Sequence, residues 1–192
     1  MNFFSLKELK NIGIKKIGKN VKVSKNVNFY NFSGSIGSNC RIDDHTILIG
    51  NIDIGNYVHI AAFNLISASK YKKKIKISDY SGVGPRCYIS CSTENYLVDD
   101  ISNPTIGKKL RKNTIFADIH IGENVLIGAG SSIIPNSSKN IHIGNNVSVG
   151  TNSIIAKTVK KDCIIYNPNN FKNNVLKIKK KNNTLKMKKK LK

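Results

Sequence analysis

Four histidines are the residues of this chain best suited to acid–base chemistry, and they lie at positions 45, 59, 120 and 142. An imidazole titrates near neutral pH, so a well-placed histidine can remove a proton from an attacking hydroxyl or amine. His120 and His142 each precede an Ile-Gly pair, where any solvated residue serves, and His45 follows two aspartates in a predicted corner. His59 opens the segment HIAAF inside a regular apolar pattern. The elements that hold these side chains decide which of them can act.

Aliphatic residues at every sixth position form the strongest pattern in the sequence. They are Ile36, Ile42, Leu48, Ile54, Ile60 and Ile66, then Ile77, Val83 and Ile89, then Ile121, Ile127 and Ile133, and finally Ile143, Val149 and Ile155. Glycine often follows the aliphatic residue, and the fifth position is small or β-branched. A period of six fits neither a helix nor a simple alternating strand, but it fits a short strand followed by a tight corner. Three such units close a triangular coil of about 18 residues.

The repeat predicts an all-β chain, a parallel β-helix whose aliphatic residues point inward and stack from coil to coil. We expect a leading segment at 1–16, which contains a short helical stretch, the β-helix at 17–168, and a tail at 169–192. Three insertions interrupt the period, near 69–76, at 95–119 and near 139–142. The second is a long excursion, and loops of that length in a compact domain usually serve a function.

Length and composition are those of one domain with tails. The chain has 192 residues and a formal net charge of +21, and residues 172–192 hold ten lysines and no acidic residue. About half of the charge therefore belongs to the tail and is weak support for a nucleic-acid partner. The four cysteines lack zinc-ribbon spacing, so we expect reduced, buried thiols. With no apolar run long enough to span a bilayer and a charged N-terminus, the sequence predicts a cytoplasmic protein.

The segments IHIGENVLIGAGSSIIP and IGNNVSVGTNSIIAKTV resemble the acetyl-CoA-binding half of the hexapeptide-repeat, left-handed β-helix acyltransferases. The segments HIAAF, STENY and NPT are similar to those of the sugar O- and N-acetyltransferases of bacterial surface-glycan synthesis, such as lipopolysaccharide or capsule. The resemblance implies a left-handed coil and a homotrimer whose acetyl-CoA slot lies between subunits. It also implies acetyl transfer from acetyl-CoA to a hydroxyl or amine of a sugar, free or nucleotide-linked, with no metal.

By position, the resemblance assigns acetyl-CoA contacts to five residues of the last coils. They are Gly128, Ala129, Thr151, Ala156 and Lys157. Small residues let the pantetheine arm approach the backbone, and a lysine can meet a phosphate of CoA. The alternative is that Ala129 and Thr151 are ordinary corner residues.

Two catalytic candidates follow from the same resemblance. His59 matches a histidine of the glycan acetyltransferases and is the expected general base. Glu94 stands where better-known galactoside and maltose acetyltransferases place a histidine. A sugar amine needs less help from a base than a hydroxyl, so an N-acetyltransferase tolerates glutamate there. Alternatively, Glu94 orients His59 across a subunit boundary, and the sequence leaves both possibilities open.

The acceptor pocket is expected to include the long excursion that follows Glu94. The candidate acceptor contacts are Asn64, Tyr96, Asn103 and Arg111. The alternative is a solvated loop without ligand contact. The family's closing Gly-Asn-Pro-Ala turn is replaced by Tyr166-Asn167-Pro168-Asn169, which puts any CoA contact by that turn in doubt.

Two other functions compete with acyl transfer. Some β-helices of this type are scaffolds or carbonic anhydrases, but the latter need histidines on neighbouring coils, and we expect no such stack among the four histidines. The lysine-rich tail, with its interspersed apolar residues, suits peripheral contact with an anionic membrane, at its inner face. We treat that contact as accessory to the enzyme and expect no specific nucleic-acid binding.

Overall fold

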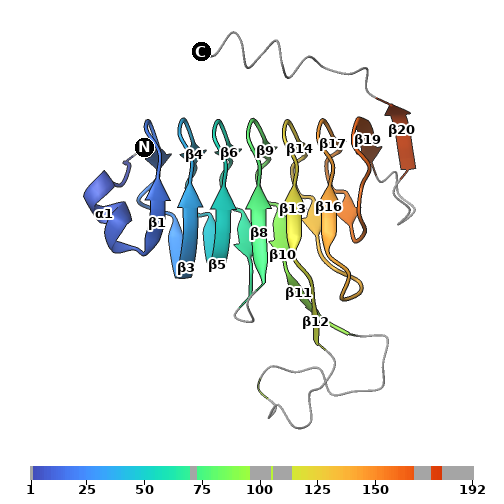
Figure 1. Ribbon diagram of the computed structural model, residues 1–192, viewed down its shortest axis with the longest axis horizontal. Coiled ribbons are helices and arrows are strands. Elements are labelled where there is room, and N and C mark those ends of the chain that lie inside the picture. The colour runs from blue at the N-terminus through green and yellow to red at the C-terminus, as the bar shows by residue number, and fades with distance from the viewer. Residues whose placement is uncertain (1, 70–72, 96–104, 106–113, 167–173, 179–192) are drawn as a thin grey trace.

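The chain forms a parallel β-solenoid, as the six-residue period predicted. The computed structural model describes residues 2–69, 73–95, 105, 114–166 and 174–178. The coils stack along the long axis of the molecule, with the N-terminal helix at one end and the last strands at the other (Figure 1). Within the described part of the chain, no helix has the length and apolar character needed to cross a membrane.

Each coil contributes one short strand to each of three faces, which we call faces 1, 2 and 3. Face 1 comprises β2 (Lys22–Val23), β4 (Arg41–Ile42), β6 (His59–Ile60), β9 (Gly82–Val83), β14 (Leu126–Ile127), β17 (Ser148–Val149) and β19 (Cys163–Tyr166). Face 2 comprises the first halves of β3 (Asn28–Ile36) and β5 (Ile47–Ile54), then β7 (Leu65–Ser67), β10 (Tyr88–Ser90), β15 (Ser132–Ile133) and β18 (Ile154–Ile155). Face 3 comprises β1 (Ile14–Ile17), the second halves of β3 and β5, β8 (Lys74–Ile77), β13 (Ile119–Ile121) and β16 (Ile141–Ile143).

The inward side of each strand forms the core. All fifteen aliphatic positions of the predicted repeat are at most 3% exposed. In-register stacking, such as Ile42 on Ile60 and Ile60 on Val83, places like residues above one another along each face. The buried aliphatic columns are thus the direct product of the sequence period. Burial of each such side chain stabilises the folded state by about 1.5 to 3 kcal/mol relative to leaving it exposed. The predicted parallel β-helix is confirmed.

Three corners join the faces, and we name each by the two faces that it connects. At corner 3/1 the turn residue is often asparagine at positive φ, for example Asn39 (59°) and Asn146 (58°). Asparagine tolerates this conformation, which most side chains avoid. The corner amides also bond from coil to coil, as between Asn124 Nδ2 and Asn146 Oδ1 at 3.1 Å.

All three insertions leave the solenoid at corner 2/3. The first occupies 68–73 and the third 134–140, so both lie slightly earlier than expected, because β8 begins at Lys74 and β16 at Ile141. The long excursion starts and ends as an antiparallel hairpin of β11 (Ser92–Glu94) and β12 (Thr114–Phe116). This hairpin projects away from the coils (Figure 1).

Both ends of the solenoid are covered. Helix α1 (Leu6–Asn11) has a capping box between Ser5 and Glu8, and it buries Leu9 against the first coil. β1 begins at Ile14, three residues before the expected start of the β-helix. At the other end, Val159 pairs with Ile143, and β20 (Asn174–Ile178) lies antiparallel to β19. These segments occupy edges that would otherwise pair with other chains.

Candidate active site

His59 lies on face 1 and is held by a carboxylate from the preceding coil. Its Nε2 atom is 2.9 Å from Oδ2 of Asp43, and the other carboxylate oxygen, Oδ1, accepts a 2.6 Å hydrogen bond from Nε of Arg41. The His59 side chain is 53% exposed, whereas that of Asp43 is 11% exposed. The result is an accessible imidazole anchored by a largely buried carboxylate.

The solenoid itself creates this arrangement. Arg41 and His59 are register partners on β4 and β6, and both side chains point outward next to the buried Ile42 and Ile60. Asp43 follows β4 directly, and its backbone N–H donates to the carbonyl of Ile60 at 2.9 Å. Its side chain is therefore fixed beside the imidazole of the next coil.

Electrostatics keep Asp43 charged. Burial of the carboxyl would raise its pKa, but hydrogen bonds from His59 and Arg41 and the charges of both outweigh that effect, so the pKa is lowered. A charged carboxylate at Nε2 favours the tautomer with its proton on that atom, which leaves Nδ1 as a proton acceptor for a substrate. The geometry is that of a base with its orienting group.

Asp43 and Arg41 are not among the site residues that the sequence predicts. A signal was available, because Arg41 stands one coil, 18 residues, before His59 in the repeat. Counting by the coil length would have placed the segment Arg41-Ile42-Asp43 beside His59. The prediction instead considered Glu94 as the orienting carboxylate.

Glu94 lies elsewhere in the chain. It ends β11 in the hairpin at corner 2/3, and its Oε2 accepts a hydrogen bond from Oγ1 of Thr114 at 3.1 Å. His59 lies in the middle of face 1 and has its own carboxylate partner within the chain. Glu94 therefore does not orient His59 within one subunit, and its part in catalysis stays a prediction.

Of the four candidate acceptor contacts, Asn64 is the one that the structure describes. It is 1% exposed, its Nδ2 donates to the carbonyl of Ala61 at 2.6 Å, and its Oδ1 accepts from N–H of Cys87 at 2.7 Å. The Asn64 amide thus joins two coils at corner 1/2. Because it is buried and bonded there, it is not one of the proposed substrate contacts. Tyr96, Asn103 and Arg111 lie outside the described residues.

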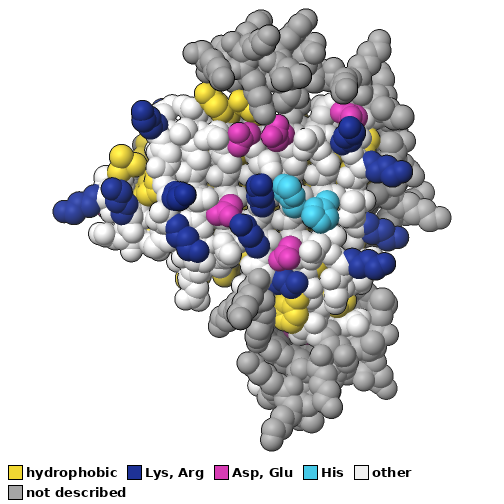
Figure 2. Space-filling view, viewed as in Figure 1, with side chains coloured by type: hydrophobic (Ala, Val, Ile, Leu, Met, Phe, Trp, Pro, Cys, Tyr) yellow, Lys and Arg dark blue, Asp and Glu magenta, His cyan; other side chains and the backbone are white. Residues whose placement is uncertain are grey.

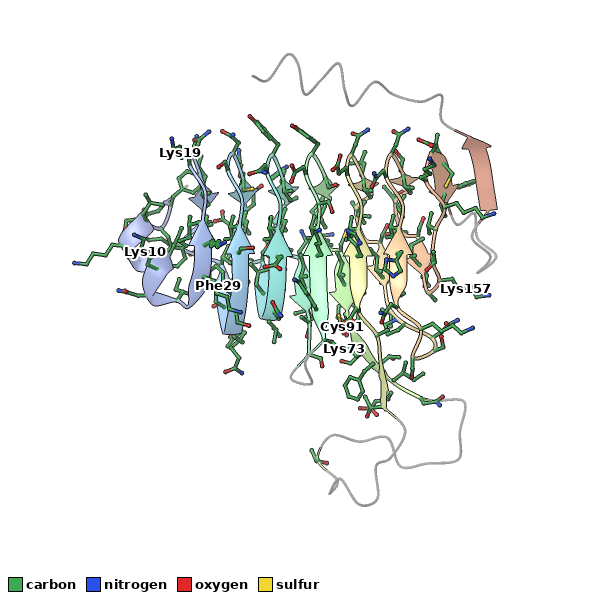
Figure 3. The ribbon with its side chains drawn as sticks, in the orientation of Figure 1. Lys10, Lys19, Phe29, Lys73, Cys91 and Lys157 are labelled. Atoms are coloured by element: carbon green, nitrogen blue, oxygen red, sulfur yellow. The ribbon has the colours of Figure 1, made fainter. Side chains whose placement is uncertain are left out.

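The predicted acetyl-CoA contacts flank face 2 at the C-terminal end of the solenoid. Gly128, Ala129 and Thr151 lie on corner 1/2, whereas Ala156 and Lys157 follow β18 at the other edge of that face. Lys157 projects outward at this end (Figure 3). A Cβ at position 128 would lie 2.6 Å from the backbone nitrogen of Thr151, so Gly128 allows the coils to stack.

Two of the other three histidines form a pair, contrary to the expectation that the histidines do not stack. His120 and His142 are register partners on face 3, with ring centroids 5.8 Å apart. Figure 2 shows a pair of histidines among lysine side chains on this polar face. Among the described residues, no group of three potential metal ligands includes them. The four cysteines are buried thiols, as expected.

Comparisons with known proteins agree with the fold. The chain matches no protein-family model. It is 38% identical over 136 residues to the dTDP-4-amino-4,6-dideoxy-D-glucose acyltransferase of Escherichia coli, covering 67% of each protein. Among solved structures, it resembles the N-acyltransferase AntD from Bacillus cereus bound to dTDP and 3-hydroxybutyryl-CoA. That match has a TM-score of 0.85 and 30% identity, and it covers 100% of this chain and 97% of AntD.

A more distant structure shares the fold alone. The acetyltransferase domain of PglB from Neisseria gonorrhoeae matches with a TM-score of 0.54 and 12% identity, over 81% of this chain and 57% of that one. The hexapeptide coils and the similarity to the Escherichia coli enzyme together identify the chain. It belongs to the hexapeptide-repeat sugar acyltransferases, enzymes that transfer an acyl group from acyl-CoA to a sugar.

Proposed function

We propose that this enzyme acetylates the amino group of a nucleotide-linked deoxyamino sugar of the dTDP-4-amino-4,6-dideoxyglucose type, with acetyl-CoA as donor and His59 as general base. The observation that carries the proposal is the exposed imidazole of His59 held by the buried Asp43. The acceptor class is that of two relatives: the Escherichia coli dTDP-4-amino-4,6-dideoxy-D-glucose acyltransferase, and AntD, a variant of which has been solved with this sugar bound.

The reaction needs one proton acceptor and one electrophile. Nδ1 of His59 takes a proton from the sugar nitrogen as that nitrogen attacks the thioester carbonyl. The tetrahedral intermediate then collapses, the C–S bond breaks, and the CoA sulfur leaves as a thiol after it receives the proton. Asp43 stabilises the imidazolium that exists between these two transfers.

We further propose that the working unit is a homotrimer whose subunits meet along face 2. This face has an outward row of apolar side chains, formed by Ile47, Leu65 and Tyr88 in adjacent coils and, beyond Ser132, by Ile154. Tyr88 and Ile154 are 37% and 44% exposed, which is unfavourable for large apolar side chains in an isolated subunit. A partner on face 2 would cover them and would border the predicted acetyl-CoA contacts on both edges of that face.

The biological setting that we propose is the synthesis of a bacterial surface glycan, because dideoxyamino sugars are building blocks of such polymers. Peripheral membrane contact through the lysine-rich tail at 169–192 stays a prediction, since most of this tail lies outside the described part of the chain.

The test of this function is release of free CoA thiol with dTDP-4-amino-4,6-dideoxyglucose, compared with the matching 4-hydroxy sugar. We expect turnover with the amine, and faster reaction from acetyl-CoA than from 3-hydroxybutyryl-CoA. Turnover with the hydroxyl sugar alone would show O-acetylation instead. Absence of turnover with both sugars, while acetyl-CoA binds, would reject a nucleotide-linked acceptor.

A further inference from the structure

Corner 1/2 carries a column of residues that all have positive φ. They are His45 (58°), Phe63 (62°), Arg86 (59°), Gly130 (70°) and Asn152 (53°). Backbone hydrogen bonds show that they occupy successive coils: N–H of Phe63 donates to Asp44 at 3.0 Å, and N–H of Arg86 donates to Ala62 at 3.2 Å. Glycine and asparagine are the usual residues in this conformation. Histidine, phenylalanine and arginine are not.

The three unusual residues are held in a strained conformation without the benefit of burial. Phe63 is 57% exposed, and its ring stacks on that of His45 with centroids 5.0 Å apart and planes at 22°. Arg86 is also exposed, and no described carboxylate forms an ion pair with it. Backbone strain that adds no packing is typical of ligand sites.

A second pair of stacked aromatic residues, at another corner, allows a comparison within the same fold. Tyr57 and Tyr80 stack at corner 3/1, with centroids 5.1 Å apart and planes at 13°, and they too have positive φ. They interrupt the ladder of asparagine amides on that corner and are half-buried. The pair at corner 1/2 has the same backbone geometry, but both of its residues are exposed.

The position of the exposed pair connects it to the candidate active site. Phe63 lies in the same coil as His59, four residues further along the chain, and His45 lies two residues after Asp43. Further along the same corner, at Gly130 and Asn152, the column runs beside Ala129 and Thr151, the predicted acetyl-CoA contacts. One edge of the solenoid thus presents stacked rings, then a cation, then small residues.

We propose that His45 and Phe63 form a stacking platform for the nucleobase of the acceptor and that Arg86 binds its diphosphate. Aromatic faces stack on any nucleobase, and a guanidinium pairs with phosphate oxygens in a bidentate manner. Coils are spaced by about 4.8 Å, so the long Arg86 side chain reaches the phosphates of a nucleoside stacked one coil away. This inference rests on the proposed function, in which the acceptor is nucleotide-linked.

The first test compares Phe63→Asn with Tyr57→Asn in the full chain, by calorimetric titration with dTDP. Asparagine suits positive φ, so both variants lose a ring without new backbone strain. We expect Phe63→Asn to weaken dTDP binding by about 5- to 100-fold, the usual effect of one lost base stack, while Tyr57→Asn binds like the wild type. Acetyl-CoA affinity should be unchanged in both variants. Phe63→Tyr keeps an aromatic ring at this position and should bind dTDP like the wild type.

The second test separates binding of the nucleobase from binding of the phosphates. Arg86→Gln should weaken dTDP binding by about tenfold and reduce its dependence on salt, since one charge-assisted contact is lost. Thymidine, which lacks the phosphates, should bind this variant as it binds the wild type, whereas Phe63→Asn should weaken both ligands.

The outcomes distinguish failure of the stacking platform from failure of the proposed function on which it rests. If the wild type binds dTDP and Phe63→Asn binds it equally well, the platform is wrong and the nucleotide-linked acceptor stands. If the wild type binds acetyl-CoA but no dTDP, the nucleotide-linked acceptor fails, and the platform fails with it.

Discussion

The reactivity that we assign to His59 depends on three side chains from two coils. Asp43 orients the imidazole, and Arg41 together with His59 keeps the carboxylate charged despite its burial. Arg41 and His59 lie on the strands β4 and β6, and Asp43 follows β4 directly. The base is therefore built on rigid strands, which hold its geometry more tightly than a loop would.

Replacing His59 with alanine tests the base directly. We expect turnover with the amino sugar to fall by about 10² to 10⁴-fold, because the nitrogen must lose its proton to water instead. The dissociation constant of acetyl-CoA should stay the same, because the predicted donor contacts lie two to three coils away. Glu94→Gln serves as the comparison: a loss confined to that variant would transfer the role of base to Glu94.

Replacing Asp43 with asparagine should change how stability depends on pH. The pKa of Asp43 is lowered in the folded chain, so its stabilising effect is present above its unfolded pKa of about 3.9 and is lost as pH falls through the folded value. The wild type should thus lose stability below pH 4 more steeply than Asp43→Asn. Melting temperatures at pH 7.0, 4.5 and 3.0 measure this, and parallel curves would contradict it.

At the level of elements, glycines at the start of corner 1/2 set how closely the coils stack. A Cβ at Gly84 would lie 2.8 Å from the backbone nitrogen of Ala129, and one at Gly128 would lie 2.6 Å from that of Thr151. These contacts are with backbone, which cannot move aside without separating the coils. The glycine of the repeat is thus a packing requirement at these corners.

Gly128 packs against backbone, whereas its neighbour Ala129 is a predicted acetyl-CoA contact. This difference yields a prediction about the acetyl-CoA slot. Gly128→Val should lower the free energy of unfolding by at least about 1 to 3 kcal/mol, through overpacking. Ala129→Leu should leave the melting temperature nearly unchanged but weaken acetyl-CoA binding, measured by calorimetry. Ala62→Leu, at the equivalent corner position two coils earlier, is the matched control and should bind acetyl-CoA normally. Normal binding by Ala129→Leu would move the slot away from this corner.

The histidine pair on face 3 is a second feature of element scale. Burial, the charge of Lys76 and the neighbouring His142 all lower the pKa of His120. The unfolded chain therefore takes up a proton more readily, and stability falls as pH drops from about 6.5 to the folded pKa. His120→Gln should show a smaller loss of melting temperature between pH 7.5 and 5.5 than the wild type. An identical loss would mean that other groups cause the acid sensitivity.

At the scale of the whole molecule, the three faces differ in character. Face 3 is polar, with Lys74, Lys76, His120 and His142 pointing outward, whereas face 2 carries the apolar row of Ile47, Leu65, Tyr88 and Ile154. A solenoid must bury its inner columns, but its outer surfaces are free to differ. An apolar outer face is therefore informative about assembly.

Charge on face 2 should disrupt the proposed trimer. Leu65→Lys is expected to convert the protein from a trimer to a monomer, because a lysine would be buried without a partner at the interface. Light scattering after size-exclusion chromatography gives the mass. His142→Lys, on the polar face, is the control and should remain trimeric. A trimeric Leu65→Lys would place the interface on another face.

The sequence alone determined the architecture, because the period of six specifies which side chains point inward, and burial of those aliphatic residues dominates folding. It also identified the chain's acyltransferase family through local motifs, and the same motifs led to His59 as the proposed base. Only the tertiary structure showed that Asp43 holds His59, that Glu94 lies on a hairpin apart from it, and that Asn64 is used between coils. Only the structure, likewise, brought His45, Phe63 and Arg86 into one column. These relations join residues separated by 16 to 23 positions, and they depend on the register and on the side of the coil from which each insertion leaves. The period places outward residues one coil apart beside each other, as with Arg41 and His59, but it does not specify which of their side chains bond or where an insertion changes the spacing.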